Sequence, residues 1–321
     1  MIYIPTPGTD ACVHLAAEYY FSFERPFPEQ ALLLWQTEPT IVVGRYQNTL
    51  AEINLPYVRA HGIRVVRRLS GGGAIYSDRG NWMYSFLTEG AGSIDFRAGV
   101  GPVIEALQAL GVPVEFGGRN DIILEGRKIS GTAQYQRQGR TVHHGTLLFD
   151  SNVDHMIAAT TVDPQKLESK GIASVRSRVV DLKDYLPQYT VERFRDAMLA
   201  QLHRGGSVYM PTEADLARIE AIADEKFRGW ENVYGRDPRC TLEKSRRFPD
   251  GRVTLQLSLK GNRITEAALM GDFFADEAAD HIAEALVGCV LDRAAVEAAL
   301  QPYDGALYGI SAADLAALAT E

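Results

Sequence analysis

Residues 67–78 read RRLSGGGAIYSD, and this stretch decides how the rest of the chain is interpreted. A β-prone run at 64–68 opens into the glycine triplet 71–73, and a second short apolar run follows. Because glycine has no side chain, the backbone N–H groups of such a loop can wrap an anionic group closely. Arg67 and Arg68 stand at its mouth and add fixed positive charge. The loop therefore predicts a phosphate or a mixed acyl-phosphate as the ligand.

The loop differs from the two common phosphate-binding signatures. Its spacing is neither GxxxxGK[ST] nor GxGxxG at a strand-to-helix turn. A kinase, P-loop or dinucleotide-binding interpretation is therefore disfavoured. Since a lone glycine triplet is more often a hairpin without a ligand, the interpretation depends on the other segments of the chain.

The composition is that of an ordinary globular chain. Of the 321 residues, 46% are hydrophobic and 23% are charged, and the formal net charge is -8, which leaves no general basic footprint for nucleic acid. No apolar run approaches the ~20 residues that span a bilayer, and the first residues lack the pattern of a secretory signal. The three cysteines lie far apart in the sequence, so we expect reduced thiols and a cytoplasmic location.

A cluster of Gly, Asp and Pro near 235–239 indicates a boundary between a large unit, residues 1–238, and a small unit, residues 239–321. In the small unit, apolar residues alternate strictly over 253–259, which predicts a strand with one buried face. We expect a small α+β module, in which a meander of strands precedes the helices. The expected strands are about 240–248, 252–260 and 263–270, and the expected helices are about 276–287, 292–300 and 311–319.

Helical spacing and short β-prone runs alternate in the large unit. The predicted helices cover about 10–24, 101–110, 191–204 and 212–228. The predicted strands lie at about 31–35, 40–44, 64–68, 82–87, 112–116, 121–124, 128–133 and 141–149.

A second candidate for chemistry lies in residues 118–135. Lys128 follows a tight turn at 125–127 and leads into the small residues 130–133, which leave room for a ligand beside its ammonium. A lone lysine is usually only solvated, but in this setting it can stabilise developing negative charge. The pair Asn120–Asp121 either positions a hydrated magnesium ion or a ribose hydroxyl, or forms an Asx turn, and the spacing favours neither.

Two further segments carry titratable groups. His143 and His144 are adjacent in a predicted strand, so they face opposite sides and cannot both point into one site. The segment 169–182 holds Lys170, Arg176 and Arg178 among small residues. It is either a solvated connector or a lid that closes over a charged intermediate and excludes water.

Taken in order, these segments resemble the lipoate–protein ligase family in its two-domain bacterial form. The matching stretches are VGRYQN (43–48), RRLSGGGAIYSDRGN (67–81), GRND (118–121), RKISGTA (127–133), HHGTLLFD (143–150) and KGIASVRSRV (170–180). The similarity continues at 230–235 and 246–274, so it spans nearly the whole chain. Several motifs in a fixed order are far more specific than one glycine loop.

The resemblance implies an α+β fold, with a large mixed-sheet catalytic domain of the biotin/lipoate ligase type and a small C-terminal accessory domain. It implies two steps: lipoate and Mg-ATP give lipoyl-AMP and pyrophosphate, and a lysine of an acceptor lipoyl domain then takes the acyl group. The implied acceptors are acyltransferase subunits of 2-oxoacid dehydrogenases and the glycine-cleavage carrier protein. Whether lipoate or octanoate is preferred stays open.

The family's functional residues carry over onto matching positions of this chain. The implied nucleotide-binding residues are Arg68, Gly73, Ala74, Ile75 and Tyr76, and the implied lipoate-binding residues are Gly71, Gly72 and Lys128. Lys128 is implied to contact both the activated carbonyl and the phosphate, and the 170–180 loop to be the adenylate-binding lid. The resemblance assigns no magnesium ligand and no base for the acceptor amine.

An apolar lipoyl tail requires a hydrophobic tunnel. Leu69, Tyr84 and Phe86 lie close to the motifs in sequence, and we expect them to form its walls.

Three alternatives compete with the ligase interpretation. An ATP-independent lipoyl or octanoyl transferase needs a nucleophilic cysteine in the catalytic core. Cys12, Cys240 and Cys289 are all remote in sequence from the motifs, which disfavours it. A biotin ligase is disfavoured by the RKISGTA stretch, and a non-catalytic lipoyl-domain-binding protein by the presence of Arg68, the glycine triplet and Lys128 together.

Overall fold

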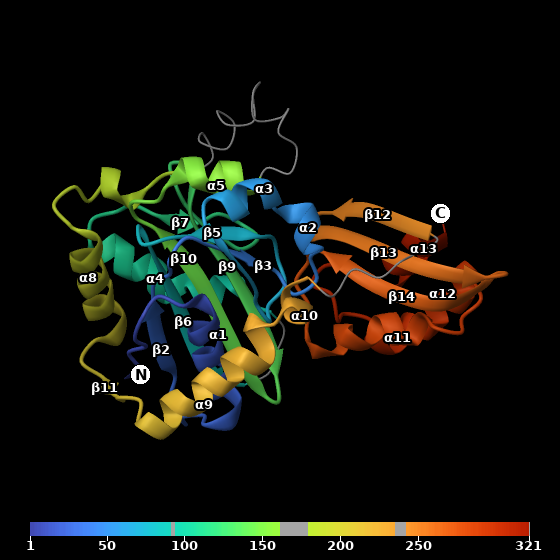
Figure 1. Cartoon of the computed structure of the whole chain (residues 1–321), viewed down its shortest axis with the longest axis horizontal. Helices are drawn as coiled ribbons and strands as arrows, with labels where there is room; N and C mark the ends of the chain where they lie inside the picture. The colour runs from blue at the N-terminus through green and yellow to red at the C-terminus, as the bar shows by residue number, and fades with distance from the viewer. Residues whose placement is uncertain (91–93, 161–178, 235–241, 321) are drawn as a thin grey trace.

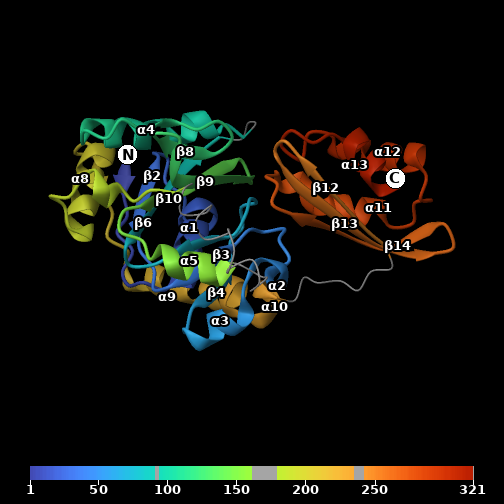
Figure 2. The same cartoon turned by 90° about the horizontal axis from the view of Figure 1, so that it is seen from above.

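The computed structural model describes residues 1–90, 94–160, 179–234 and 242–320. Figures 1 and 2 show two units side by side, a large one built on a wide sheet and a small C-terminal one, drawn in orange and red. Both units combine helices with mainly antiparallel strands, so the prediction of an α+β fold with a large mixed sheet is confirmed.

The large unit is built on an eight-stranded sheet with the order β11-β1-β2-β6-β10-β9-β8-β7. β1 is parallel to both of its neighbours, and the remaining pairs are antiparallel. The strands are β1 (Ile2–Tyr3), β2 (Ala31–Trp35), β6 (Asn81–Glu89), β7 (Glu115–Phe116), β8 (Asp121–Leu124), β9 (Arg127–Arg137), β10 (Arg140–Leu148) and β11 (Ser207–Val208).

Helices cover both faces of this sheet, and Figure 2 shows α4 on one side and α9 on the other. One face packs against α4 (Phe96–Ala109) and α8 (Val191–His203). The other packs against α1 (Ala11–Tyr19) and α9 (Glu213–Ala223). Alternate residues of β2 enter the two cores, because successive side chains of a strand point to opposite faces.

A second, three-stranded sheet holds the glycine loop. In it β3 (Thr40–Val43) lies between β4 (Arg64–Arg67) and β5 (Ile75–Ser77), parallel to the first and antiparallel to the second. The chain leaves β4, turns through the glycine triplet and returns on the far side of β3. The short helices of the large unit are α2 (Thr49–Glu52), α3 (Leu55–Ala60), α5 (Val153–Thr160) and α10 (Trp230–Val233), with 3-10 and π turns at Leu182–Asp184, Tyr20–Glu24 and Asp224–Arg228.

The small unit is a three-stranded antiparallel meander that packs on helices. Its strands are β12 (Leu242–Phe248), β13 (Gly251–Lys260) and β14 (Arg263–Gly271). Its helices are α11 (Ile282–Leu286), α12 (Arg293–Leu300) and α13 (Ala312–Thr320), with 3-10 turns at Glu277–His281 and Gln301–Tyr303. The predicted alternation is present, since Val253, Leu255 and Leu257 are fully buried against the helices.

The two units meet at the glycine loop. The N–H of Gly72 donates to the carbonyl of Phe273 at 2.8 Å, and the N–H of Gly271 donates to the carbonyl of Tyr46 at 2.7 Å. The rings of Tyr46 and Phe273 stack with centroids 4.7 Å apart, and Arg45 forms an ion pair with Asp280. The segment after β14 therefore packs directly on the loop that the sequence singled out.

The element boundaries differ from the sequence prediction in identifiable ways. α4 begins at Phe96 rather than near 101, although Pro102 within it lacks an N–H to donate. Packing of the apolar face of α4 on the sheet outweighs this cost. The predicted helix 10–24 is α1 followed by a π-helical turn, and most of the predicted 170–180 lid lies outside the described residues.

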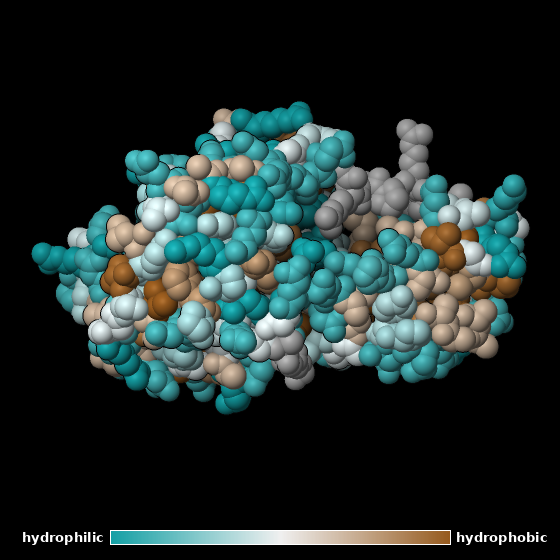
Figure 3. Space-filling model, turned by 90° about the horizontal axis from the view of Figure 1, so that it is seen from below, coloured by the Kyte–Doolittle hydropathy of each residue, from teal (hydrophilic) through white to brown (hydrophobic). Residues whose placement is uncertain are grey.

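Hydrophilic residues dominate the face of the molecule in Figure 3. Among the described residues, no helix is both long enough and apolar enough to span a membrane.

Arg67 ties the large unit together behind the glycine loop. Its buried guanidinium donates to the carbonyls of Gln47 at 2.6 Å and Val233 at 2.7 Å, and to the hydroxyl of Thr49 at 2.6 Å. It also donates to the carbonyls of Gly44, Arg45 and Asn232.

We expect Arg67→Met to lower the free energy of unfolding by about 3 kcal/mol or more, because several buried acceptors lose a charged donor. The matched control is Arg64→Met on the same strand, whose exposed side chain forms an ion pair with Asp10; its loss costs about 1 kcal/mol or less. Urea denaturation of both variants measures the difference. Equal losses would contradict the structural role of Arg67.

Candidate active site

The three glycines of the loop have different surroundings. A Cβ on Gly71 would lie 2.2 Å from the carbonyl oxygen of Phe273, and one on Gly72 would lie 2.7 Å from the ring of Phe274. Gly72 also has a φ of +86°, which side chains rarely adopt. A Cβ on Gly73 would meet nothing within 4 Å. Two glycines are therefore required by close packing, while the third faces open space.

Arg68 lies buried inside the loop rather than at its mouth. Its Nη2 donates to the carbonyls of Gly71 at 2.6 Å and Gly73 at 2.8 Å, and its Nη1 donates to the carbonyl of Val42 at 3.0 Å. Its Nε donates to Ser70 Oγ at 3.0 Å. Burial lowers the pKa of Arg68 to about 10, which still leaves the guanidinium charged at neutral pH. Four of its five N–H groups are thus used, and the fifth, on Nη1, bonds to no other residue that the structure describes.

The bond from Arg68 to the carbonyl of Gly73 decides which way the N–H of Ala74 points. In a planar trans peptide the C=O and the following N–H point in opposite directions. Because the carbonyl of Gly73 turns toward Arg68, the N–H of Ala74 turns away from it. Within the described part of the chain, the N–H groups of Gly73 and Ala74 have no hydrogen-bond partner. The loop therefore presents two unused donors, the arrangement that an anion requires.

Arg67 does not share this position. The sequence places both arginines at the mouth of the loop, but the side chain of Arg67 runs to the opposite side of β4, where it bonds to backbone carbonyls of the large unit and to Thr49. Adjacent strand residues point to opposite faces, so only one of two consecutive arginines can face the loop.

Lys128 enters the site from the start of β9. Its Nζ lies 2.8 Å from Asp121 Oδ1 in a half-exposed ion pair. A Cβ on Gly131 would lie 2.7 Å from this Nζ, so a side chain at residue 131 would displace the lysine ammonium from this position. Its carbonyl accepts a hydrogen bond from the N–H of Val180 at 3.1 Å. The chain that follows the predicted lid is thus anchored beside Lys128.

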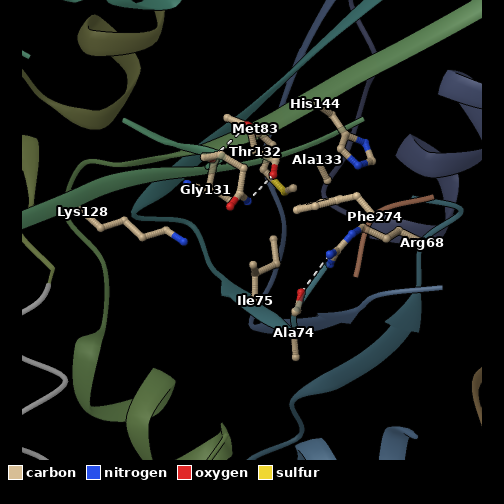
Figure 4. A pocket seen from close by; sticks show the side chains of 14 residues that line it. Arg68, Ala74, Ile75, Met83, Lys128, Gly131, Thr132, Ala133, His144 and Phe274 are labelled. Carbon is tan, nitrogen blue, oxygen red and sulfur yellow. Dashed lines mark hydrogen bonds between the residues drawn. The ribbon is translucent and has the colours of Figure 1, made fainter. Parts of the chain in front are cut away.

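One cavity joins these groups. It has about 460 Å³ of open space, part of it continuous with solvent, and is lined by Arg68, Gly73, Ala74, Ile75, Met83, Asn120, Lys128, Gly131, Thr132, Ala133, His144, Gly145, Thr146 and Phe274. In Figure 4 the ammonium of Lys128 and the guanidinium of Arg68 enter it from opposite sides, with Ile75 and Ala74 between them. Two cations from distant segments and two free amides therefore converge on one space.

Three of the residues predicted for the ligand do not line this cavity. Gly71 and Gly72 pack against the small unit, as described above. The ring of Tyr76 is buried and stacks on His155 with centroids 6.5 Å apart. Asn120 does line the cavity, and its Nδ2 donates to the carbonyl of Thr132 at 2.7 Å.

The apolar wall also differs from the prediction. Tyr84 and Phe86 of β6 point to the opposite face and pack under α4, and Leu69 packs on the core beneath α1. Met83 is the residue of β6 that reaches the cavity, so the predicted wall is displaced by one residue along the strand. Because side chains alternate with a period of two, a displacement of one residue moves each side chain to the other face.

The two adjacent histidines face opposite sides of the sheet, as predicted. His144 lines the cavity, whereas His143 packs against α4, where a Cβ on Gly99 would lie 2.3 Å from its Nδ1. Burial lowers the pKa of His143 to about 3, so this side chain is neutral at physiological pH.

Phe274 was not predicted as part of the site. It lies far along the chain, in the small unit, and its ring closes the cavity beside Arg68. It falls within the matching stretch 246–274, but no local pattern indicates that it reaches the large unit.

The cysteines give no support to a thioester mechanism. Cys12 is buried in the α1 core, where burial raises the pKa of its thiol to about 12, and Cys289 belongs to the small unit. Neither lines the cavity. Cys240 lies outside the described residues.

Family models match the chain in two segments. The model of the lipoyl protein ligase A/B catalytic domain covers residues 10–203, and the model of the bacterial lipoate protein ligase C-terminus covers residues 237–318. The fold, the cavity and these matches define a two-domain protein ligase that handles an acyl group.

Individual relatives identify the family to which the chain belongs. Lipoate-protein ligase LplJ of Bacillus subtilis is 41% identical over 300 residues, which cover 91% of each chain. Among solved structures, P. falciparum LipL1 in complex with lipoate superposes with a TM-score of 0.77 at 19% identity over 94% of each chain. Lipoate-protein ligase A bound with ATP gives a TM-score of 0.63 at 22% identity over 73% of this chain and 97% of that one. The chain belongs to the lipoate–protein ligase family, and the predicted function, lipoate–protein ligation, is confirmed.

Thiol alkylation tests the assignment of Cys12. Because burial raises the pKa of this thiol to about 12, its thiolate fraction at pH 8 is about one part in 10,000. We expect iodoacetamide to leave Cys12 unmodified in the folded protein and to modify it after denaturation, as read by peptide mass mapping. Rapid modification of native Cys12 would reopen the transferase interpretation.

Gly73→Ala tests whether the open side of the loop faces the ligand. Because the new methyl meets no protein atom, we expect the melting temperature to change by less than about 2 °C. The methyl projects beside the free amides, so kcat/KM for lipoate should fall about 10-fold or more. Gly101→Ala on α4, which also has open space around it, is the control and should retain activity. Full activity of Gly73→Ala would place the ligand elsewhere.

Proposed function

We propose that this cavity condenses lipoate with ATP to lipoyl-AMP and then passes the lipoyl group to a lysine of an acceptor lipoyl domain. The observation that carries the proposal is the convergence of Lys128, Arg68 and the free amides of Gly73 and Ala74 on one partly apolar space. The solved relatives that hold lipoate and ATP support the same ligands for this chain.

Charge explains why the first step needs such a site. A carboxylate oxygen of lipoate attacks the α-phosphorus, a P–O bond forms, and the bond to the leaving pyrophosphate breaks. Two anions must approach each other, and negative charge grows on the phosphoryl oxygens. Lys128, the remaining N–H of Arg68 and the loop amides oppose that charge, because they are fixed before the reaction begins.

The second step reuses Lys128. The neutral amine of the acceptor lysine attacks the acyl carbonyl, an amide bond forms, the C–O bond to AMP breaks, and the proton lost from the amine is released to solvent with AMP. An ammonium at the start of β9 can polarise the carbonyl while AMP leaves. The apolar residues Met83, Ile75 and Ala133 would accommodate the aliphatic tail.

Magnesium enters this scheme as Mg-ATP. The described residues contain no group of three or more His, Cys, Asp or Glu side chains placed to hold a metal ion. This agrees with the usual behaviour of magnesium, which binds mainly to substrate phosphates and to one or two carboxylates. Asp121, beside Lys128, is the carboxylate that would fit this role.

The remaining assignments belong to the same proposal. We assign Arg68, Gly73, Ala74, Ile75 and Tyr76 to the nucleotide, and Lys128, Gly71 and Gly72 to the lipoyl group. For Gly71, Gly72 and Tyr76 this requires the small unit or the stacked His155 to shift when the substrates bind. The domain boundary at 238/239 is supported by the ranges of the two family models. A cytoplasmic location rests on the isolated cysteines.

The acceptors we propose are lipoyl domains of 2-oxoacid dehydrogenase acyltransferase subunits and the glycine-cleavage carrier protein. Mass spectrometry of each purified apo acceptor, after incubation with enzyme, Mg-ATP and either lipoate or octanoate, identifies both the acceptor and the preferred acyl group. A mass increase without ATP would favour the transferase, and a complex without any mass increase would favour a binding protein.

Lipoate-dependent ATP–pyrophosphate exchange tests the role of Lys128. We expect Lys128→Met to lower the exchange rate by about 10²–10³, because one preorganised cation is lost from the transition state. Arg127→Met is the matched control. The side chain of Arg127, next to Lys128 in sequence, bonds to Glu125 and Tyr185 outside the cavity, so the activity of this variant should stay near that of the wild type. Normal exchange by Lys128→Met would remove this residue from the mechanism.

A further inference from the structure

A chain of buried hydrogen bonds runs behind the wall of the cavity. Ser70 Oγ lies 2.7 Å from His144 Nε2, and His144 Nδ1 lies 3.0 Å from Glu18 Oε1. Arg68 Nε is 3.0 Å from Ser70 Oγ, and Ser85 Oγ is 2.5 Å from Glu18 Oε1. The four residues Glu18, Ser70, Ser85 and His144 are each at most 3% exposed.

Donors and acceptors can be assigned consistently to every hydrogen bond in this series. A carboxylate only accepts, so His144 Nδ1 carries the proton that Glu18 receives. Nε2 of His144 then accepts from the hydroxyl of Ser70, and that oxygen accepts from Arg68 Nε–H. On this assignment each group has a partner, which matters because an unpaired buried polar group is costly.

The geometry resembles a nucleophilic serine with its histidine base, but the surroundings argue against that role. Ser70 is fully buried and is not part of the cavity lining. A substrate in the cavity meets Arg68 and His144 instead, and Ser70 lies behind them as a bridge. The chain therefore connects two residues of the cavity wall to a buried carboxylate on α1.

Glu18 also bears on the charge of the site. Burial lowers the pKa of Arg68 to about 10, and the Glu18 carboxylate opposes this decrease. A buried carboxylate thus helps to keep the guanidinium charged without touching it.

We propose that Glu18 and His144 are positioning residues for lipoate activation, and that they orient Arg68 through Ser70. Arg68 in turn holds the carbonyls of Gly71 and Gly73. This series of hydrogen bonds therefore determines which way the N–H of Ala74 points. A residue on the first helix would then control the anion-binding loop about fifty positions further along the sequence. This inference rests on the proposed function for its effect on catalysis, but its effect on Arg68 can be measured separately.

The kinetic test uses the full-length protein with Glu18→Gln, Ser70→Ala and the double variant. Each single change should lower kcat of lipoate-dependent ATP–pyrophosphate exchange about 10- to 100-fold, with KM for ATP and lipoate changed less than about 3-fold. Because both changes interrupt one chain, the double variant should be no worse than the more severe single variant, within about 3-fold. Multiplied effects in the double variant would overturn the proposal.

Ser22→Ala is the matched control for loss of a buried hydroxyl. Ser22 follows α1, is fully buried, and its Oγ has no hydrogen-bond partner among the residues that the structure describes. It should retain exchange activity. If it lost as much activity as Ser70→Ala at a similar melting temperature, disturbance of the α1 core rather than the chain would explain the result.

The second readout does not depend on activity. In ¹H–¹⁵N spectra of the wild type, the Arg68 Nε–H should exchange slowly with solvent, and in Glu18→Gln its resonance should shift or broaden although residue 18 does not touch Arg68. An unchanged resonance in a folded Glu18→Gln variant would overturn the inference. If the wild type catalyses no exchange, the proposed activation step fails, while the spectra still decide whether Glu18 positions Arg68.

Discussion

The hydrogen bonds from one buried guanidinium to its own loop hold the site in place. Arg68 holds the carbonyls of Gly71 and Gly73, and the planar peptide after Gly73 then turns the N–H of Ala74 away from the guanidinium. Without that interaction the flexible triplet could present oxygen atoms to the cavity and repel an anion. The reaction of a lipoate–protein ligase brings a carboxylate and a triphosphate together, so a site whose donors are fixed in advance suits the chemistry.

The glycine triplet serves two purposes that the sequence does not separate. Gly71 and Gly72 let the Phe273–Phe274 segment approach the backbone, and only Gly73 leaves its open side toward the cavity. The small unit thereby completes the wall through Phe274. Ligand binding and contact between the units therefore depend on neighbouring peptides of one loop. A change in the position of the small unit would thus also change the shape of the cavity.

Sequence reasoning succeeded where one local pattern has one structural solution. The alternation over β13 gave the buried face of the meander, and the adjacency of His143 and His144 placed them on opposite faces. It failed where the sequence does not show which face of a strand a side chain occupies. Tyr84 and Phe86 are as apolar as a tunnel wall requires, but β6 is buried on both sides, so hydrophobicity alone did not show that Met83 faces the cavity. For the same reason, the sequence predicted Arg67 at the mouth of the loop, although its side chain points to the opposite side of β4.

By itself, the sequence determined the family, the α+β class and the set of chemical groups available, because ordered motifs and residue periodicity are properties of the chain itself. Only the tertiary structure decided which of those groups meet. Glu18, Ser70 and His144 come from three separate segments, and no spacing along the chain encodes the 2.7 Å between Ser70 and His144. Such a contact depends on how the two sheets and α1 pack, and that packing is a collective result of many apolar residues distributed over the entire large unit.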